Sequence, residues 1–352
     1  MRLAILSSLA LLAIAPPSSV FAEADCSEPL VRKEWRTLSS EEKQSYLSAV
    51  QCLQKTPGKT SDSYPGVQSR YDDFQAEHIQ MTDLVHFVGF FQPWHRMFVA
   101  QYESDLRSWC NYTGAQPYWD WSLDAVSPEA FLKAPVFDAV DGFGGNGPYV
   151  DSANDPSVVA HIPGKTGGGC ITDGPFKDRK VSMGPGKSTK LNPHCLRRDI
   201  APEFAASKLN STMVDWVLSA DNFLEFDIRV QGGISADAAT YHGGGHRGVG
   251  GDLGEIADIY SSPGDPLFFM HHANMDRLWH KWQHLDWDTR QSDIGGPDTQ
   301  FAYPFDFFGT NPSYANVTLN YKMTYHNLVP GPFVKVRDVM ETQKHGLCYT
   351  YE

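Results

Sequence analysis

The sequence lacks clusters of basic residues. Its 352 residues include 29 Lys and Arg against 42 Asp and Glu, which gives a formal net charge of −13. Proteins that bind nucleic acid gather a basic surface to neutralise phosphates, and proteins that dock on anionic lipid use runs of Lys and Arg. We therefore expect neither kind of partner. Hydrophobic residues make up 41% of the chain, so it can bury a core and fold.

Beyond the N-terminus, the sequence also lacks an apolar segment long enough to cross a bilayer, which needs about 20 residues. The run Leu3–Ala15 follows Arg2 and leads to small residues ending at Ala22. This pattern is typical of a secretory signal peptide over residues 1–22, and a buried N-terminal helix is the alternative. We therefore expect a secreted, extracellular protein. Three sequons are candidate glycosylation sites: Asn111, Asn210 and Asn316.

No Cys-x-x-Cys pair occurs, so thiolate ligation of a metal is not expected. The six cysteines are Cys26, Cys52, Cys110, Cys170, Cys195 and Cys348. An even number in an oxidising compartment predicts disulfides. Six cysteines allow about 15 connectivities, and the sequence does not choose among them. Because Cys170 and Cys195 bracket one Gly- and Pro-rich stretch, we favour that pair.

Helical patterns alternate with long stretches that show little periodicity. Ser39 and Glu42 have the spacing of a capping box, which predicts a helix that ends at Pro57-Gly58. Further helical patterns cover residues 93–109, 201–224 and 266–285, whereas residues 136–200 are irregular and residues 333–336 favour a strand. No internal repeat or low-complexity linker occurs. The sequence predicts one mainly α domain with long irregular loops and a few short strands.

The placement of the histidines is the most informative feature of the sequence. Two separate groups occur: His78, His86 and His95 in the first, and His242, His246, His271 and His272 in the second. Imidazole is a ligand that suits copper, and neither group follows a pattern with Asp, Glu or Cys ligands. The glutamate of the HExxH zinc-protease motif is absent. Each piece alone has an ordinary alternative, such as a core histidine or a flexible glycine loop, but two groups in one chain favour a binuclear site.

The residues around these histidines form two long motifs. The first is His86-x8-His95 with Pro93-Trp94-His95-Arg96 and then Glu103, and the second runs from Asp265-Pro266 through Phe268-Phe269 and His271-His272 to Asp276-Arg277-x-Trp279. They resemble the two copper-binding motifs of the tyrosinase, catechol oxidase and haemocyanin family, the type 3 copper proteins. GPFKDRKVSMGPG and NPHCLRRDIAP are similar to the central region of short secreted fungal members. Cys348-Tyr-Thr-Tyr351 resembles the tyrosine motif that closes the family's catalytic domain.

The resemblance covers essentially the whole mature chain. It implies a single catalytic domain over residues 23–352, in which a central helical bundle holds a binuclear copper site. The C-terminal domain that shields the site in latent relatives is expected to be missing. The implied ligands are His78, His86 and His95 for copper A, and His242, His246 and His272 for copper B. His271 is then a neighbour of the site, and Asp276, four residues after His272, is expected to orient a ligand ring from outside.

Three departures from the family pattern affect the expected chemistry. Leu84 stands where many members have a Cys that forms a thioether to a His, so no crosslink is expected. Gly243 follows the first copper B ligand, where enzymes that hydroxylate monophenols often have Asn. The acidic residue that holds a water near copper B has no clear counterpart, and Asp237 and Glu225 are candidates. Four phenylalanines are expected to line the site or to belong to the ordinary core: Phe90, Phe91, Phe268 and Phe269.

The resemblance therefore implies a secreted polyphenol oxidase with two copper ions that uses O2 to oxidise o-diphenols to o-quinones. Small phenolic compounds are the expected partners, with o-aminophenols and some monophenols as further candidates. Two alternatives stay open, namely a tyrosinase with genuine monophenol hydroxylase activity and an oxidase that tailors one specialised metabolite. A haemocyanin-like oxygen-binding protein is a third. Oligomeric state does not follow from the sequence.

Overall fold

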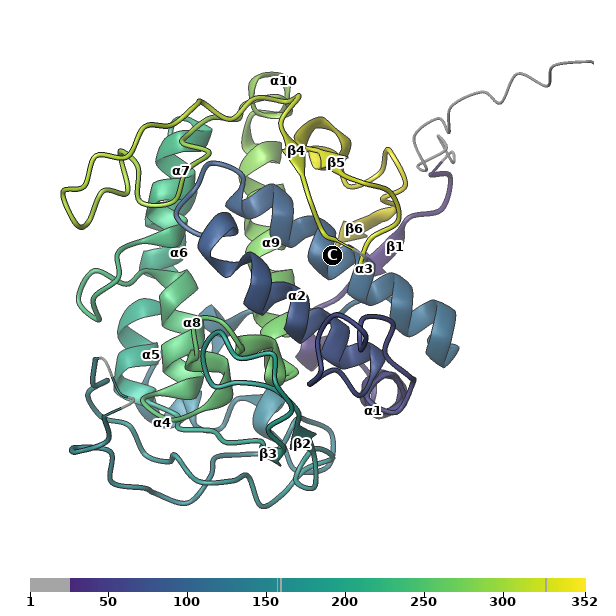
Figure 1. Cartoon of the computed structure of the whole chain (residues 1–352), viewed down its shortest axis with the longest axis vertical. Helices are drawn as coiled ribbons and strands as arrows, with labels where there is room; N and C mark the ends of the chain where they lie inside the picture. The colour runs from purple at the N-terminus through teal and green to yellow at the C-terminus, as the bar shows by residue number, and fades with distance from the viewer. Residues whose placement is uncertain (1–25, 157, 159, 327) are drawn as a thin grey trace, which may run out of the picture.

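A computed structural model describes residues 26–156, 158, 160–326 and 328–352, so the expected signal peptide lies outside the described residues (Figure 1). The α-helices in this part of the chain are α1 (Ser40–Leu53), α2 (Arg70–Val85), α3 (Phe91–Cys110), α4 (Pro128–Phe131), α5 (Pro202–Lys208), α6 (Ser211–Leu218), α7 (Phe223–Gln231), α8 (Tyr241–Gly250), α9 (Leu267–Leu285) and α10 (Trp287–Arg290). The strands are β1 (Leu30–Arg32), β2 (Lys180–Val181), β3 (His194–Cys195), β4 (Lys322–Met323), β5 (Val334–Lys335) and β6 (Tyr349–Tyr351). The mainly α fold with a few short strands is confirmed.

The long helices α2, α3 and α9 cross at the centre of the molecule, where α3 packs on α9 (Figure 1). Helices α5 to α8 stack along one side of this centre, and α8 contacts both α5 and α9. Residues 136–200 run across one end with little regular structure beyond β2 and β3, as the sequence predicts. The helical centre therefore provides rigid elements on which a site can be built.

Local sequence explains where the predicted helices begin. At the start of α1, the Ser39 side chain accepts from the Glu42 N–H at 3.2 Å and the Glu42 carboxylate accepts from the Ser39 N–H at 2.8 Å. This is the predicted capping box. In α3, Trp94, Phe98 and Tyr102 recur every four residues and are buried, which fixes the inward face of the helix.

Two parts of the helical prediction differ from the structure. The stretch 201–224 is not one helix, because the side chains of Asn210 and Asn222 each cap a new helix, α6 and α7. Asn favours such caps because its oxygen accepts from the first free N–H groups of the helix. Helix α2 was not predicted, although Ser69 and Asp72 form a capping box at its start.

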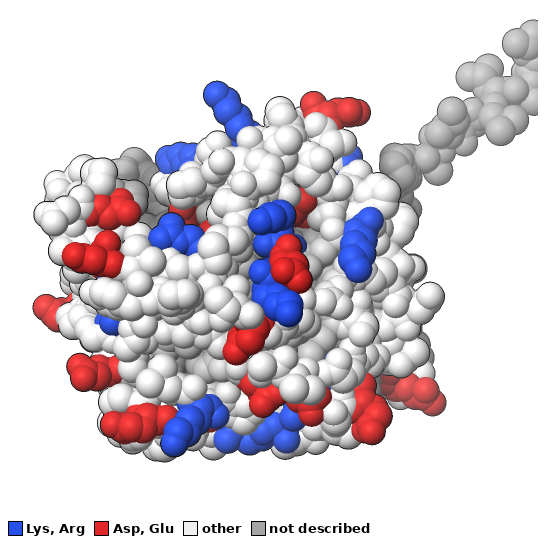
Figure 2. Space-filling view, turned by 90° about the horizontal axis from the view of Figure 1, so that it is seen from below, with Lys and Arg blue, Asp and Glu red and all other residues white. Residues whose placement is uncertain are grey.

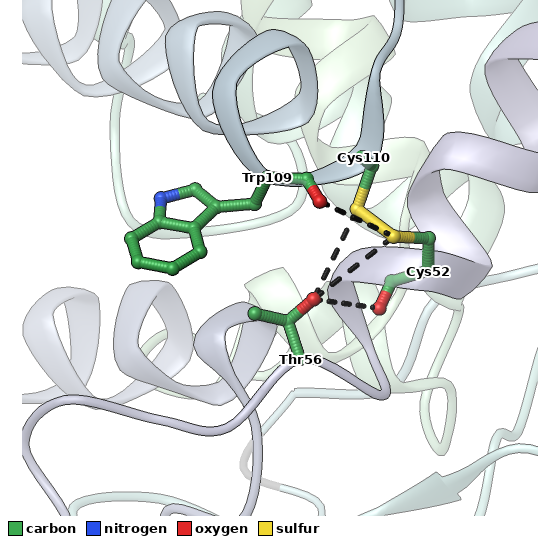
Figure 3. Close-up of a disulfide and its surroundings, with 4 residues drawn as sticks. All are labelled: Cys52, Thr56, Trp109 and Cys110. Carbon is green, nitrogen blue, oxygen red and sulfur yellow. Dashed lines mark hydrogen bonds between the residues drawn. A yellow bond between two sulfur atoms is a disulfide. The ribbon is translucent and has the colours of Figure 1, made fainter.

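Three disulfides join distant parts of the described chain: Cys26–Cys348, Cys52–Cys110 and Cys170–Cys195. The favoured pair Cys170–Cys195 is confirmed. The Cys26–Cys348 bond lies beside the parallel pair β1–β6, in which Leu30 is opposite Tyr349. The Cys52–Cys110 bond ties the end of α1 to the end of α3, with the Thr56 hydroxyl packed against both sulfurs (Figure 3).

The surface agrees with the charge balance of the sequence. On the face drawn in Figure 2, basic side chains are interspersed with acidic ones and form no broad basic field. Within the described ranges, no helix is both long enough and apolar enough to span a membrane.

A buried ionic network joins β1, β6, α3 and α9. Arg32 is fully buried, and its guanidinium donates to Glu103 at 2.6 Å and to Asp276 at 3.2 Å. The hydroxyls of Tyr349 and Tyr351 donate to the same Asp276 oxygen, and the Arg96 guanidinium donates to the other. Burial opposes ionisation of Asp276, but Arg96 and Arg32 outweigh it and hold the pKa of this carboxyl below its ordinary value. The network therefore fixes β1 and β6 to the central helices.

We expect Arg32→Met to lower the free energy of unfolding by about 3–5 kcal/mol, because it leaves Glu103 buried without a counter-charge and leaves Asp276 with Arg96 alone. Chemical denaturation measures the loss. The matched control is Lys33→Met, which removes a solvent-exposed ion pair to Glu42 and is expected to cost less than about 1 kcal/mol. Equal losses in the two variants would contradict the stabilising role of the network.

Candidate metal centre

The structure brings the six predicted ligand histidines together at the helical centre. They come from α2 (His78), from the residue that ends α2 (His86), from α3 (His95), from α8 (His242 and His246) and from α9 (His272). They form two trios, and within each trio one nitrogen from every ring lies within 4.8 Å of the others. Residues more than 150 positions apart in the chain thus converge on one place.

The two trios lie against each other. The rings of His95 and His272 stack with centroids 4.5 Å apart, and the rings of His86 and His242 stack at 5.8 Å. Phe268 packs on His272 at 4.1 Å and on His78 at 5.1 Å, while Phe91 packs on His95 and His242. These two phenylalanines therefore form apolar walls of the site. Phe90 and Phe269 stack instead on Tyr321 and Tyr102.

Backbone carbonyls set the orientation of four of the rings. The Nδ1–H groups donate at 2.7–2.9 Å, in the pairs His78 to Tyr260, His86 to Thr82, His95 to Phe91 and His246 to Ile256. A neutral imidazole that donates from Nδ1 has a free lone pair on Nε2. Such outer hydrogen bonds fix the tautomer and the direction in which a metal ligand offers its lone pair.

The inward nitrogens have the properties of metal ligands. The Nε2 atoms of His78, His95 and His242 are buried and have no hydrogen-bond partner. Those of His246 and His272 lie 3.2 Å apart, so two further nitrogens converge. Buried polar atoms normally find partners, and a cluster of imidazole nitrogens without them is suited to a transition-metal cation such as copper. The residues present therefore fit a pair of copper ions.

The electrostatics of the site keep these rings neutral. Burial lowers the pKa values of His86 and His246 to about 4. Burial, and then the neighbouring imidazoles, lower the pKa values of His78, His95, His242 and His272 well below the usual range. Neutral imidazole is the form that binds a metal, so the ligands are available throughout the neutral pH range.

Exposure shows on which side the site opens. His78, His95 and His272 are at most 2% exposed, whereas His86 and His242 are 6% and 8% exposed and His246 is partly exposed. Arg247 follows His246 in α8; its Nη2 donates to the Ile234 carbonyl at 2.8 Å, and its Nη1 is buried without a partner. Burial lowers the pKa of Arg247. No carboxylate of the described residues forms an ion pair with this cation.

His271 lies beside the site with both ring nitrogens engaged. Its Nδ1 accepts from the Trp121 indole at 3.1 Å and its Nε2–H donates to the His242 carbonyl at 3.1 Å. No lone pair is left for a metal. The ring fits against Gly245, where an added Cβ would lie 2.2 Å from a ring carbon of His271.

The structure corrects the expected role of Asp276. Its oxygens are occupied by Arg32, Arg96, Tyr349 and Tyr351, and no histidine ring is among its hydrogen-bond partners. The carbonyl groups described above orient the rings instead. Asp276 therefore stabilises the position of α9 rather than a ligand ring.

The two acidic candidates also lie elsewhere. Asp237 is exposed, and Glu225 pairs with Arg229 on the surface of α7. The buried acid in this region is Asp227, which sequence analysis missed. It lies four residues after Phe223 and three before Val230, on the apolar face of α7, and this spacing could have indicated its burial.

The remaining predicted positions lie outside the histidine cluster. Leu84 is 56% exposed, and a Cβ added at Gly243 would meet only the Ala239 side chain, at 3.2 Å. Asn111 and Asn316 are exposed, whereas the Asn210 side chain caps α6.

Comparison with known proteins agrees with this geometry. A family profile described as the common central domain of tyrosinase matches residues 68–285, which include all six histidines. The chain is 36% identical to N-acetyl-6-hydroxytryptophan oxidase from Emericella nidulans over 99% of this chain and 100% of that protein. It is also 36% identical to tyrosinase P from Aspergillus terreus, over 78% of this chain and 81% of that one.

Among solved structures, a glycine-to-asparagine variant of polyphenol oxidase from Thermothelomyces thermophila superimposes with a TM-score of 0.79 at 33% identity. The match covers 92% of this chain and 89% of that one. The two histidine trios, the profile match and the full-length relatives lead to one conclusion. The chain belongs to the tyrosinase family of copper oxidases, which carry a type 3 dicopper site and use O2.

Proposed function

We propose that this chain is a secreted o-diphenol oxidase whose natural substrates are catechols. His78, His86 and His95 hold copper A, and His242, His246 and His272 hold copper B. One observation carries the assignment: in each of two histidine trios, ring nitrogens converge within 4.8 Å of one another, and the Nε2 atoms of His78, His95 and His242 are buried without a partner. Both nitrogens of His271 are engaged, which supports its exclusion from the ligand set.

Two copper ions held in this way supply the redox chemistry that moves two electrons from an o-diphenol toward O2, so that two catechols and one O2 give two o-quinones and two waters. The chain's own residues provide the setting. Phe91 and Phe268 keep water away from the rings, and the outer carbonyls hold four of the imidazoles in one tautomer. Within the described residues, no carboxylate hydrogen-bonds to the six rings. This supports oxidation of diphenols, which lose their protons readily, over hydroxylation of monophenols, which benefits from a base.

The opening near His86, His242 and His246 is where a phenol enters. We further propose that Arg247, the residue after His246, reaches this opening and favours substrates that carry an acidic group, because an anion would neutralise a partly buried cation. We therefore expect catechols with a carboxylate to bind more tightly than uncharged ones.

A second candidate function is the tailoring of one specialised phenolic metabolite. The full-length similarity to a protein named N-acetyl-6-hydroxytryptophan oxidase favours it. The substrate would then be a hydroxylated aromatic amino-acid derivative, whose carboxylate is suited to Arg247. o-Aminophenols, genuine monophenol hydroxylation and reversible oxygen binding are further alternatives that the same substrate panel separates.

Secretion is part of the proposal. The signal-peptide pattern over residues 1–22 and the three disulfides support an oxidising, extracellular environment for a mature domain over residues 23–352. Asn111 and Asn316 are exposed and accessible to glycosylation, and Asn210 is the third candidate.

The purified, copper-loaded protein is expected to consume O2 with catechol without prior activation, and to turn over 3,4-dihydroxybenzoate with a lower KM than catechol. Oxygen uptake with a panel of catechols, monophenols, methoxyphenols, o-aminophenols and 6-hydroxyindoles measures both. His95→Ala is expected to abolish turnover and copper A binding. Uptake with none of these phenols, despite two bound copper ions, would refute the oxidase proposal.

The adjacent pair His271-His272 allows a direct test of the ligand assignment. His272→Ala is expected to lose one copper ion per chain, because it removes an inward nitrogen. His271→Ala is expected to keep two, with lower stability from the lost Trp121 hydrogen bond. Copper content by elemental analysis distinguishes the variants, and the reverse pattern would show that the assignment within the pair is wrong.

The metal-free protein is expected to lose stability as pH falls from about 6.5 to about 4. The folded chain holds His86 and His246 with pKa values of about 4, whereas the unfolded chain protonates them near 6.5, so the unfolded state binds more protons in this window. Each such histidine contributes a slope of about 1 kcal/mol per pH unit. Urea titrations from pH 4.5 to 7.5 measure it, and His86→Gln should reduce the slope. A flat profile would contradict the burial of neutral rings.

A further inference from the structure

His86 differs from the other five histidines of the centre in its backbone position. The others lie within α2, α3, α8 and α9, whereas His86 ends α2 with extended backbone angles (φ −112°, ψ 145°). The next residue, Phe87, has a φ of +57°, which is unfavourable for a residue with a large side chain. No helix therefore fixes His86 from both sides, and other contacts must hold it in place.

The side chain of Gln231 holds the backbone that follows His86. Gln231 is the last residue of α7 and is only 2% exposed. Its Oε1 accepts from the Phe87 N–H at 2.5 Å, and its Nε2 donates to the Val88 carbonyl at 3.1 Å. One amide thus bonds to both sides of the turn that contains the unfavourable φ angle.

Asp227 holds Gln231 from behind. It lies one turn earlier on α7, is fully buried, and accepts from the Gln231 Nε2 at 2.8 Å. No described cation pairs with it, and burial raises the pKa of this carboxyl well above its ordinary value. The raised pKa favours the uncharged form of the Asp227 carboxyl, which can still accept a hydrogen bond from the Gln231 amide and needs no counter-ion. The pair therefore works as a neutral, directional support.

The other side of the turn is packed equally closely. The Gly89 N–H donates to the Pro297 carbonyl at 2.8 Å, and a Cβ added at Gly89 would lie 2.1 Å from the Gly295 carbonyl oxygen. The turn of residues 87–89 is therefore enclosed between α7 and residues 295–297. Leu84, two residues before His86, is exposed and has no atom that could fix the ring.

We propose that Gln231, supported by Asp227, is a positioning residue that holds His86 in place as a ligand of copper A. Helix α7 packs against α8, which carries His242 and His246. Gln231 therefore links the backbone of one trio to the helices of the other. This inference rests on the ligand assignment proposed above and goes beyond it by naming what positions its least constrained ligand.

Equilibrium copper titration of the metal-free full chain tests the proposal. Gln231→Met keeps the length of the side chain and removes both hydrogen bonds to the turn, together with the one to Asp227. We expect the affinity for one of the two copper ions to fall about 10–100-fold, as is typical when an outer partner of a ligand is lost, and the affinity for the other to stay within about twofold. The half-loaded protein should then give the electron paramagnetic resonance signal of an isolated Cu(II) ion, which a coupled pair lacks.

Gln116→Met is the matched control. Gln116 is an equally buried glutamine that accepts from the Tyr46 hydroxyl, donates to the Pro117 carbonyl and contacts the Met270 sulfur, and it has no hydrogen bond to the six histidines or to the turn after His86. Its loss is expected to lower the melting temperature without changing the affinity for either copper ion. If Gln231→Met leaves both affinities within twofold, or if both variants weaken copper equally, the proposal is wrong.

Two further variants keep the test decisive if Gln231→Met folds poorly. Asp227→Asn retains an oxygen that accepts from Gln231 and is expected to keep the copper affinity of the parent protein, whereas Asp227→Leu is expected to lower it for the same single ion. Equal copper affinities in these two variants would show that Asp227 does not support Gln231. His86→Ala separates this proposal from the proposed function. If His86→Ala retained both copper ions, the premise that His86 is a ligand would be wrong. Two bound copper ions in the parent protein without catechol oxidation would refute only the proposed activity.

Discussion

The site depends on one property of neutral imidazole: a ring that donates from one nitrogen can offer a lone pair only from the other. Four rings donate from Nδ1 to backbone carbonyls, so their lone pairs face inward. For His86 and His95 the acceptor lies four residues earlier in the chain, whereas for His78 and His246 it comes from the segment between α8 and α9. Helix geometry and one connecting segment together aim the ligands.

Burial makes this arrangement energetically demanding, because every nitrogen without a partner costs free energy in the apo-protein. The stability of the surrounding structure offsets this cost. The Arg32–Asp276 network and the three disulfides hold β1, β6 and the helix ends in place, which opposes any movement of the histidines toward water. A bound cation then gains from nitrogens that are already aligned and dehydrated.

The sequence predicted those features whose signals are local. The capping box at Ser39, the helix at 266–285 and both histidine groups follow from spacing within short windows. Asp276 was assigned a wrong partner because Arg32 lies 244 residues away from it, and no pattern reveals such a contact. Asp227 was missed for a different reason: Glu225 and Asp237 are acids as well, and only the three-dimensional packing of α7 decides which of them is buried.

Helix α8 shows why local propensity could not have established the site. It contains five glycines in ten residues, each of which disfavours a helix by about 1 kcal/mol relative to alanine. Tertiary contacts must offset this cost. The glycines allow them, because an added Cβ at Gly248 would lie 2.9 Å from Ala205 and one at Gly245 would overlap His271. Side chains there would push α8 away from α5 and α9, and with it His242 and His246. The weak helix former is thus required for the close packing that brings two ligands to the centre.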